Sequence, residues 1–363
     1  MQHREERVLE GVFAVSKPAG VSSADVLKKL QGAFASSQTF APLLKEQPKR
    51  PSKGEENVFR MGHGGTLDPL AAGVLIVGIG RGTKQMQQYL ACTKSYETTI
   101  LFGASTDSYD STGVVTECAT HEHVNRELVT KKLELFKGKI MQVPPVYSAL
   151  KINGIKACEY VRLGKELPRQ LESREVHVED CELVEWYDAG EHEFRYPGEH
   201  SPAPGPVARI RLTVSSGFYV RSFAHDLGLA CDSRAHMVSL LRTRQAEFTT
   251  ESSAEASGLV TALTYADLDA GEVVWGPKLK PQLEKWVDAH PVARGHINGR
   301  DPDTKCKLAQ GLASRPKQRF RGEYVADSKK ERIKQQGGKY KGKWGRKPEK
   351  DLTGTAGSSP LTT

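Results

Sequence analysis

One stretch of the sequence, MGHGGTLDPLAAGVLIVGIG at residues 61–80, limits what this chain can fold into more than any other. A polar, glycine-rich loop carries one histidine and one aspartate and runs directly into the apolar residues 74–79, which predict a buried strand. Gly64 and Gly65 allow backbone angles and close approaches that a Cβ atom would forbid. Because the strand fixes one end of the loop and a proline stiffens the chain just after Asp68, we expect this carboxylate to be held in one place, where another molecule can approach it.

Spacing alone leaves two interpretations of Asp68 open. The carboxylate could serve an active site, or it could cap its own turn, as loop aspartates commonly do. The sequence GIGRGTK at residues 78–84 does not decide between them, since it matches neither the dinucleotide-binding nor the phosphate-loop fingerprint. A nucleotide-binding metabolic enzyme that uses this segment is therefore a weak third hypothesis.

The positive charge of the chain is concentrated in its last part. The 363 residues carry a formal net charge of +8, but residues 305–350 alone hold 16 Lys and Arg against 4 Asp and Glu. In the same segment only five of 46 residues are Leu, Ile, Val or Phe, too few to offset the entropy of ordering a chain. We expect residues 291–363 to form a basic, mostly disordered tail that suits a polyanion such as nucleic acid.

Several broad classes of protein are not supported. The six cysteines form no CxxC pair, so the sequence predicts neither a disulfide framework nor a metal site. Residues 1–15 contain three glutamates and lack the apolar run of a signal peptide. No apolar segment approaches the roughly 20 residues that a membrane helix needs. We expect a soluble, intracellular protein without a metal ion.

Hydrophobic periodicity predicts strands and helices without strict alternation, which favours an α+β fold over a parallel sheet. Residues 36–57, rich in Pro, Ser and Lys, predict a mobile insertion, and residues 188–206 predict a loop. Strands are predicted at residues 12–15, 74–79, 95–102, 175–187 and 208–214, and helices at residues 22–35, 125–137, 222–230, 235–242 and 281–289, with another helix capped by Thr83.

Five blocks of sequence together resemble one protein family. They are VSKPAGVSS at 15–23, GHGGTLDPLAAGVL at 62–75, KSYETTILFGASTDSYDSTG at 94–113, VPPVYSALKINGIKACEYVRLG at 143–164 and SGFYVRSFAHDLG at 216–228. In this combination and order the chain resembles the TruB family of tRNA pseudouridine-55 synthases, in particular its eukaryotic stand-alone branch. The resemblance implies the pseudouridine synthase fold over residues 1–290, with a central mixed, mostly antiparallel sheet and flanking helices and loops.

The resemblance implies that Asp68 is the catalytic aspartate. The implied reaction breaks the N1–C1′ bond of a uridine, turns the uracil within the pocket and joins C5 to C1′, so it needs no cofactor and no activated water. An ionised carboxylate would stabilise or capture the positive charge that develops at C1′. Arg221 matches the family arginine that pairs with the aspartate, and its guanidinium could hold the carboxylate bidentately. Outside the family it would be an ordinary surface arginine.

Two tyrosines match residues of the family pocket. Tyr96 corresponds to the catalytic tyrosine that stacks on the target base, although core packing would explain its place at the start of a strand equally well. Tyr219 corresponds to a second pocket tyrosine, although its surroundings also fit a plain hairpin.

Other residues are implied to bind the substrate or to support the loop. His63 corresponds to a histidine that takes the space of the extruded nucleotide, whereas an isolated loop histidine is otherwise commonly solvated. Lys17, in the SKPAG motif, corresponds to a residue that supports the active-site loop, whereas a surface turn is the alternative. The loop residues expected to contact substrate are Gly64, Gly65 and Thr66.

The implied substrate is the T-arm of tRNA, together with mRNA sites of the same loop shape. The target base must be flipped out of the folded RNA. Residues 143–174 match a family insertion that clamps the RNA arm, although a charged, solvated loop would have a similar composition. Its basic residues, which could follow phosphates, are Lys151, Lys156, Arg162, Lys165, Arg169 and Arg174.

The chain departs from the family pattern in three places. Shorter members lack the insertion at 36–57, and bacterial members usually have TGALDP where this chain has GGTLDP. The tail offers no strand pattern for a PUA domain, which contacts the tRNA acceptor end in relatives that have one. We expect the basic tail to replace that contact electrostatically.

The leading hypothesis is a stand-alone tRNA pseudouridine-55 synthase that acts as a monomer in the nucleus, the mitochondrion or the cytoplasm. The principal alternative is a non-catalytic chaperone that folds tRNA by flipping and releasing the base. Basic clusters in the tail suit either a nuclear signal or RNA binding; they include Lys329, Lys330 and Arg332.

Overall fold

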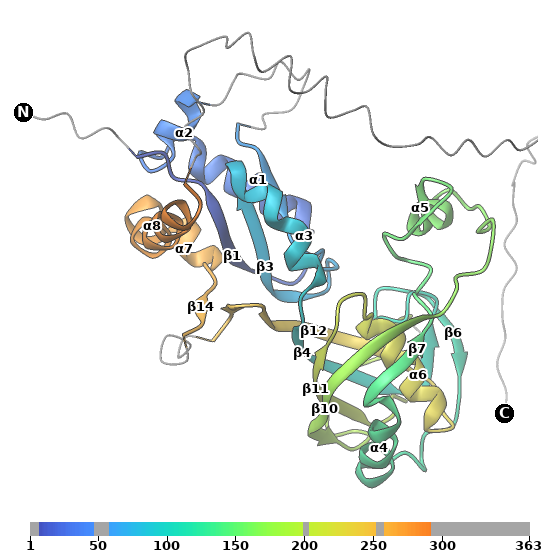
Figure 1. Cartoon of the computed structure of the whole chain (residues 1–363). Coiled ribbons are helices and arrows are strands. Elements are labelled where there is room, and N and C mark those ends of the chain that lie inside the picture. The colour runs from blue at the N-terminus through green and yellow to red at the C-terminus, as the bar shows by residue number, and fades with distance from the viewer. Residues whose placement is uncertain (1–6, 47–57, 199–202, 252–257, 292–363) are drawn as a thin grey trace, which may run out of the picture. The chain divides into compact units, whose positions relative to one another are not determined.

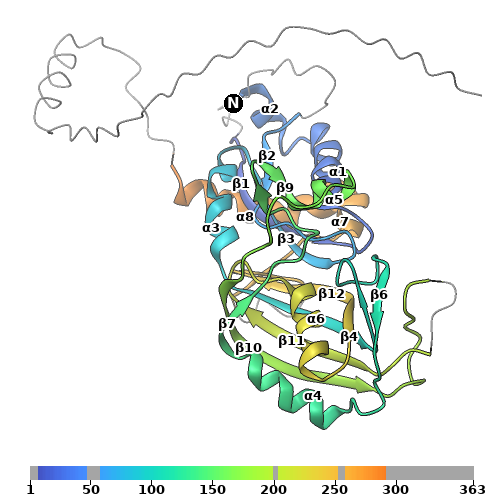
Figure 2. The ribbon, with the colours of Figure 1, turned by 90° about the vertical axis from the view of Figure 1, so that its right-hand side faces the viewer.

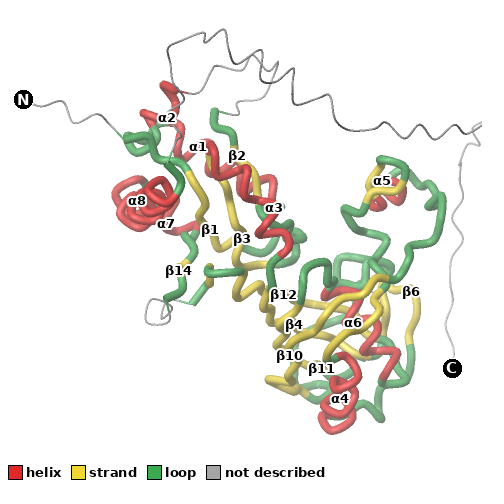
Figure 3. The backbone as a smooth tube through the Cα atoms, in the orientation of Figure 1, coloured by secondary structure: helices red, strands yellow, loops and turns green. Residues whose placement is uncertain are grey.

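The computed structural model describes residues 7–46, 58–198, 203–251 and 258–291 (Figure 1). Their strands are β1 (Gly11–Lys17), β2 (Met61–His63), β3 (Ala72–Ile79), β4 (Lys94–Phe102), β5 (Ala104–Thr106), β6 (Val115–Cys118), β7 (Gly138–Gln142), β8 (Lys151–Ile152), β9 (Ile155–Lys156), β10 (Arg174–Tyr187), β11 (Val207–Val214), β12 (Ala235–Gln245), β13 (Phe248–Thr249) and β14 (Val260–Thr261). Their helices are α1 (Ser23–Ala35), α2 (Ala41–Glu46), α3 (Met86–Ala91), α4 (Arg126–Leu133), α5 (Ala157–Arg162), α6 (Val220–Ala230), α7 (Tyr265–Asp269) and α8 (Glu272–Ala289), with 3₁₀ turns η1 (Gly80–Gln85) and η2 (Glu134–Phe136) (Figure 3).

Ten of these strands form one sheet whose main path is β1-β3-β12-β4-β11-β10-β7. Its strand pairs are antiparallel except for β12 with β3 and β13 with β14. The predicted α+β fold with a central mixed, mostly antiparallel sheet is therefore confirmed. β12 comes late in the chain, yet it lies between β3 and β4, beside the loop that carries Asp68.

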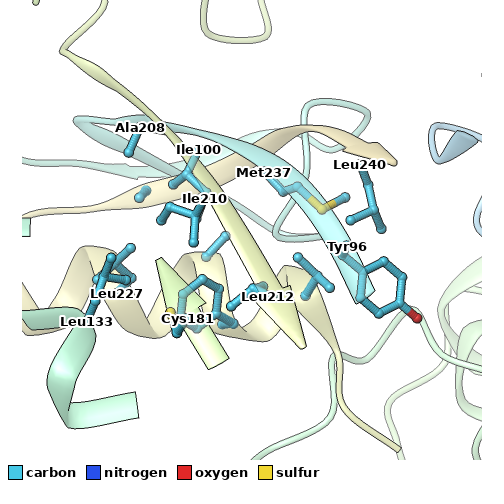
Figure 4. Packing of buried hydrophobic residues seen from close by; sticks show 14 of the residues in the cluster. Tyr96, Ile100, Leu133, Cys181, Ala208, Ile210, Leu212, Leu227, Met237 and Leu240 are labelled. Carbon is cyan, nitrogen blue, oxygen red and sulfur yellow. The ribbon is translucent and has the colours of Figure 1, made fainter. Parts of the chain in front are cut away.

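Helices α4 and α6 cover one face of the sheet formed by β4, β11 and β10 (Figure 2). In β11 the buried residues Ile210 and Leu212 alternate with the more exposed Arg209 and Arg211, as a strand with one covered face requires. Figure 4 shows how side chains from β4, β11 and β12 pack together with Leu227 of α6. This cluster forms the apolar support for the functional loops.

The sheet around β1 and β3 is covered on both faces, which explains the unbroken apolar sequences of these strands. Helices α1, α7 and α8 pack on one face, where Phe34 and Trp275 are buried with their ring centroids 4.8 Å apart. On the other face α3 contributes Met86 and Tyr89. No helix in the described ranges combines the length and apolar character that crossing a bilayer requires.

The structure differs from the predicted mobile insertion over residues 36–46. This segment contains α2, and Phe40 is fully buried against Phe34, with ring centroids 4.5 Å apart. The Glu272 carboxylate accepts hydrogen bonds from the backbone N–H groups of Gln38 and Thr39 over 2.9 and 2.8 Å. The prediction failed because the abundance of Pro, Ser and Lys outweighed two apolar residues that are buried in the core, Phe40 and Leu43. Residues 47–57 of the predicted insertion lie outside the described ranges.

The predicted helix at residues 235–242 is wrong, because this segment is the central strand β12. Both faces of β12 are largely buried, so its apolar residues do not alternate, and a short unbroken apolar run cannot be assigned by periodicity alone. Pairing with β3 on one side and β4 on the other decides for the strand.

Three smaller expectations had different outcomes. Thr83 does not cap a helix; it lies within η1, and its hydroxyl donates to the carbonyl of Gly80 over 2.8 Å. Residues 188–198 and 203–206 form no helix or strand, as expected for the loop. The basic tail predicted at 291–363 lies outside the described ranges except for its first residue.

Phe40→Ala should destabilise the protein by about 3 kcal/mol, because it removes a fully buried ring from a packed aromatic cluster. The free energy of unfolding, measured by urea denaturation, tests this value. Val273→Ala is the matched control, since Val273 is 84% exposed and its truncation should change stability little. A change of less than 1 kcal/mol for Phe40→Ala would show that residues 36–46 do not belong to the core.

Candidate active site

The loop that carries Asp68 connects β2 to β3 and turns tightly just after the acid. The N–H of Ala71 donates to the carbonyl of Asp68 over 3.0 Å, with Pro69 at the second position of the turn, where its fixed φ angle is favoured. The side chains of Leu67 and Ala71 belong to the buried cluster under α4 and α6. The acid is therefore flanked by two apolar anchors, in agreement with the expectation that it is held in place.

Two side chains from the N-terminal part of the chain fix the backbone of this loop. The hydroxyl of Ser23 accepts a hydrogen bond from the N–H of Leu67 and donates one to its carbonyl, both over 2.9 Å. The Nζ of Lys17 donates to the carbonyls of Pro18, Val21 and Pro69 over 2.9, 2.5 and 3.3 Å. Lys17 is thus bonded to the carbonyl of the residue that follows Asp68.

Lys17 is a fully buried cation. Burial lowers its pKa to about 8, while the nearby Asp68 carboxylate acts in the opposite direction and Arg242 lowers the pKa further. Three carbonyl acceptors compensate for the lost hydration of the ammonium group. The lysine and the acid are close enough to attract each other, so the charge of Lys17 contributes to the electrostatics of the loop.

Strand β12 holds the first half of the loop, a contribution that the sequence did not predict. The buried Arg242 donates from Nη2 to the carbonyl of Gly65 over 3.0 Å and from Nε to the carbonyl of Val74 over 2.7 Å. Gln245 donates from Nε2 to the carbonyl of Gly64 over 2.6 Å. An arginine and a glutamine within an apolar segment were the signal that could have revealed these contacts.

The glycines of the loop are required for different reasons. A Cβ atom on Gly64 would lie 2.7 Å from the Cβ of Tyr89, so the site has no room for a side chain. Gly65 has a φ angle of 140°, a region that residues with a side chain rarely adopt. Thr66, the third predicted contact residue, is exposed at the tip of the loop.

The structure brings Asp68 and Arg221 together, 153 positions apart in sequence. The Nε of Arg221 donates to Oδ2 of Asp68 over 2.8 Å. The arginine side chain is only 6% exposed, whereas the aspartate side chain is 40% exposed. The pairing uses one nitrogen of the guanidinium and is not bidentate. The acid is consequently braced on one side and open to another molecule on the other.

The remaining nitrogens of Arg221 bond to two backbone carbonyls. Nη1 donates to Ser108 over 3.0 Å and Nη2 to Tyr147 over 2.8 Å. A second carboxylate, that of Asp110, lies 3.7 Å from Nε. Asp110 is buried, and its other oxygen accepts hydrogen bonds from Ser108 and Thr112. These contacts fix the guanidinium plane, so Arg221 reaches Asp68 without freedom to swing away.

Tyr96 lies at the edge of the apolar cluster, where it is 7% exposed. Figure 4 shows its ring beside the other labelled side chains and its hydroxyl pointing away from them. The same cluster contains Leu67 and Ala71 of the Asp68 loop, so the tyrosine and the acid share one apolar support. Its position is compatible with both the predicted stacking role and ordinary packing.

His63 precedes the two loop glycines, at the end of β2. Burial, followed by the charge of Arg242, lowers the pKa of its imidazole, so the ring is neutral at pH 7. Its Nδ1 atom is buried and has no hydrogen-bond partner. An unpaired, neutral ring beside the loop is compatible with a residue that another molecule contacts.

Tyr219, at the start of α6, is held by side chains from two strands. Its N–H donates to Oε1 of Gln142 over 2.8 Å, and Nε2 of Gln142 donates back to its carbonyl over 3.0 Å. The guanidinium of Arg174 lies over its ring, 4.8 Å from the centroid. Tyr219 precedes Arg221, the residue that bonds to Asp68, by two positions along the chain.

The predicted RNA-clamping segment at 143–174 contains β8, β9 and α5, with a small apolar cluster of its own around Ile152 and Tyr160. It reaches the site through the carbonyl of Tyr147. Five of its six basic side chains are exposed, namely Lys151, Lys156, Arg162, Lys165 and Arg169. The sixth, Arg174, is half-buried against Tyr219.

A hollow of about 300 Å³ lies away from these residues, on the face of the sheet not covered by α4 and α6. In it Arg209 pairs with Glu97 over 2.7 Å and with Glu185 over 3.1 Å. It contains none of the predicted site residues.

The arrangement can stabilise a cationic centre next to Asp68. The carboxylate is half exposed, the paired guanidinium is fixed, and the neighbouring surface is apolar and aromatic. Asp110 is poorly placed to activate a water molecule as a second acid would, since its side chain is buried, one oxygen accepts hydrogen bonds from Ser108 and Thr112, and the other faces Arg221. In the part of the chain that the structure describes, His, Cys, Asp and Glu side chains form no group of three that could hold a metal ion.

Sequence comparisons found similarity to pseudouridine synthases. Residues 53–220 match the model of the TruB family pseudouridylate synthase N-terminal domain. The tRNA pseudouridine synthase 4 of Schizosaccharomyces pombe is 33% identical over 66% of this chain and 79% of the relative's length. The tRNA pseudouridine synthase 4 of Saccharomyces cerevisiae is 30% identical over 76% of this chain and 85% of the relative's length. A solved Cbf5-Nop10-Gar1 complex matches with a TM-score of 0.45 at 23% identity, over 71% of this chain and 54% of the matched chain.

The stability contributed by Lys17 should increase with pH. Its pKa is about 8 in the folded protein and about 10.4 in an unfolded chain, so between these values the unfolded state binds more protons and alkaline pH favours folding. Between pH 7 and pH 10 the difference in unfolding free energy between the wild type and Lys17→Met should shift in favour of the wild type by about 2 kcal/mol. A pH-independent difference would show that burial does not depress the pKa of the lysine.

Proposed function

Because the chain belongs to the TruB family of pseudouridine synthases, we propose that it converts uridine 55 in the T-arm of tRNA to pseudouridine. Pseudouridine formation in tRNA is the activity by which its relatives are named. The observation that carries the proposal is the Asp68 carboxylate, bonded to the buried Arg221 at 2.8 Å while 40% of its side chain remains exposed. This is the environment that an acid needs to stay ionised beside a ribose.

The proposed reaction is balanced within a single nucleotide. The N1–C1′ bond breaks, the uracil rotates in the pocket, C5 bonds to C1′, and the proton on C5 is lost while N1 gains one. Asp68 acts on the sugar in one of two ways, by bonding to C1′ or by assisting loss of a proton from C2′. Both routes use the same carboxylate, because both develop positive charge on the ribose.

The target base has to leave the RNA stack before Asp68 can reach its sugar. Flipping costs a few kcal/mol, and stacking in the pocket offsets this cost. We assign the stacking face to Tyr96 and the opposite wall to Tyr219, while His63 fills the space that the nucleotide leaves. Thr66 is exposed next to the buried Gly65, so the RNA backbone can approach the loop at this residue.

Contacts to the RNA outside the pocket come from the segment 143–174 and, by our proposal, from the tail. The exposed lysines and arginines of that segment supply phosphate contacts. Uridines of mRNA in loops of the same shape are further substrates, since the site recognises a flipped uridine and its surrounding backbone. We propose that the protein acts as a monomer in the nucleus, the mitochondrion or both, with the cytoplasm as a further compartment.

Asp68→Asn should bind an unmodified T-arm stem-loop almost as tightly as the wild type but form no pseudouridine, because the amide keeps the shape of the acid and lacks its charge. Mapping of the product base after incubation measures the activity, and a filter-binding Kd measures the affinity. Asp180→Asn is the matched control, since Asp180 is exposed on β10. If the wild type binds this RNA and forms no product, the tRNA-folding chaperone is the better description.

Deletion of residues 305–363 should weaken tRNA binding and reduce its salt dependence, because the first 46 of these residues carry a net charge of +12. For every phosphate that the tail neutralises, its deletion should lower the slope of log K against log salt by roughly 0.7 to 0.9. The measurement is the Kd of tRNA over a series of KCl concentrations. An unchanged slope would exclude an electrostatic role of the tail in binding.

A further inference from the structure

The two ends of the segment 143–174 meet at one pair of neighbouring residues in the sheet, Gln142 and Arg174. It leaves the sheet after Gln142, the last residue of β7, and re-enters at Arg174, the first residue of β10. These two residues are direct partners in the antiparallel pairing of β7 with β10. Both of them contact Tyr219. The segment that we expect to contact RNA is therefore joined to the sheet at the point where the pocket tyrosine is held.

Gln142 fixes the backbone of Tyr219. Its amide group bonds to both the N–H and the carbonyl of the tyrosine, over 2.8 and 3.0 Å. Gln142 itself is 1% exposed, so water does not compete for these bonds. A reciprocal pair of this kind sets the position of the residue and the direction in which its side chain leaves the backbone.

Arg174 fixes the ring of Tyr219. Its guanidinium lies over the ring at 4.8 Å, and its Nη2 donates to the carbonyl of Gly217. Gly217 has a φ angle of 82°, and a Cβ atom on it would lie 3.4 Å from the guanidinium carbon, so the chain passes close to the arginine here. The Nε of Arg174 is buried without a partner, which fits a side chain held in place by stacking.

Further contacts join the same two parts of the chain. The hydroxyl of Ser222 donates to the carbonyl of Val143 over 2.7 Å, and Arg221 donates to the carbonyl of Tyr147 over 2.8 Å. The base of the segment is thus bonded to Tyr219, Arg221 and Ser222 in succession. A shift of this base would therefore change the contacts of these three residues.

We propose that Gln142 and Arg174 are positioning residues for Tyr219, which hold its ring in the orientation that contacts the flipped uracil. The assignment rests on the proposed function. It separates Arg174 from the five exposed basic residues of the segment, which contact phosphates. Arg174 acts through the tyrosine ring, and a planar guanidinium is required for this role because a lysine cannot stack in the same way.

The test compares variants on the full chain with an unmodified T-arm stem-loop. Arg174→Ala should lower the single-turnover rate at saturating RNA by on the order of tenfold, because a misplaced pocket group slows the chemical step, while Kd changes much less. Arg174→Lys should not rescue the rate. Gln142→Glu, which removes the donor to the Tyr219 carbonyl, should show the same decrease in rate. Arg169→Ala removes an equal charge from the same segment, and its effect should appear in Kd.

A coupled variant decides whether Arg174 acts through the ring. In a Tyr219→Leu background, Arg174→Ala should cause little further decrease in rate, since the ring that it positions is gone. An equal decrease in both backgrounds would overturn the proposal. The proposal would also be overturned if Arg174→Lys restored the rate while Arg174→Ala raised Kd and reduced the salt dependence of binding. That combination would identify Arg174 as a phosphate contact.

Two controls show whether a slower rate comes from the general loss of an arginine or from unfolding of the variant. Arg126→Ala, at an exposed residue on α4, should leave rate and Kd unchanged. Urea denaturation shows whether each variant is folded, and Gln142→Glu provides a second route to the same question if Arg174→Ala is destabilised. A wild type that forms no pseudouridine refutes the proposed function itself, whereas a wild type with full activity and silent Arg174 and Gln142 variants refutes only the positioning role.

Discussion

The contact between Asp68 and Arg221 is the constraint around which the rest of the site is arranged. A carboxylate that is to meet a ribose must keep its charge while substrate removes water from it, and a fixed guanidinium at 2.8 Å supplies the compensating charge. Arg221 gives one nitrogen to the acid and the other two to backbone carbonyls at residues 108 and 147. Three segments that are distant in sequence therefore converge on one side chain, and the position of the acid depends on all of them.

The loop of Asp68 is held through its carbonyl groups by buried donors. Lys17, Arg242 and Gln245 bond to carbonyls of residues 64, 65 and 69, and two of these donors are cations. Burying a cation is unfavourable unless its donors are satisfied, so such residues are used where position matters more than stability. The charge of Lys17 also lies close enough to Asp68 to attract its carboxylate. Lys17 thus both shapes the loop and favours a negative charge on the acid.

Much of the fold and part of the site were predictable from the sequence, for reasons that differ between elements. β11 shows the alternation of a strand with one covered face, and β3 was assigned correctly from its short apolar run between glycines. The family resemblance predicted Asp68 and Arg221 as partners although 153 positions separate them. β12 was assigned wrongly because its two buried faces remove the alternation that periodicity needs. The contacts of Arg242, Gln245 and Gln142 were not predicted, since each joins residues more than 70 positions apart and depends on strand order, which local sequence does not encode.

The order of the strands has a consequence for synthesis of the chain on the ribosome. β12 lies between β3 and β4, and its residues 242 and 245 bond to the loop at 64 and 65. Nearly 180 residues must be added after the loop before these partners exist. The nascent N-terminal part therefore exposes an unpaired strand edge for roughly 10 to 40 seconds at elongation rates of about 5 to 20 residues per second. The Asp68 loop cannot reach its final conformation before the C-terminal half emerges.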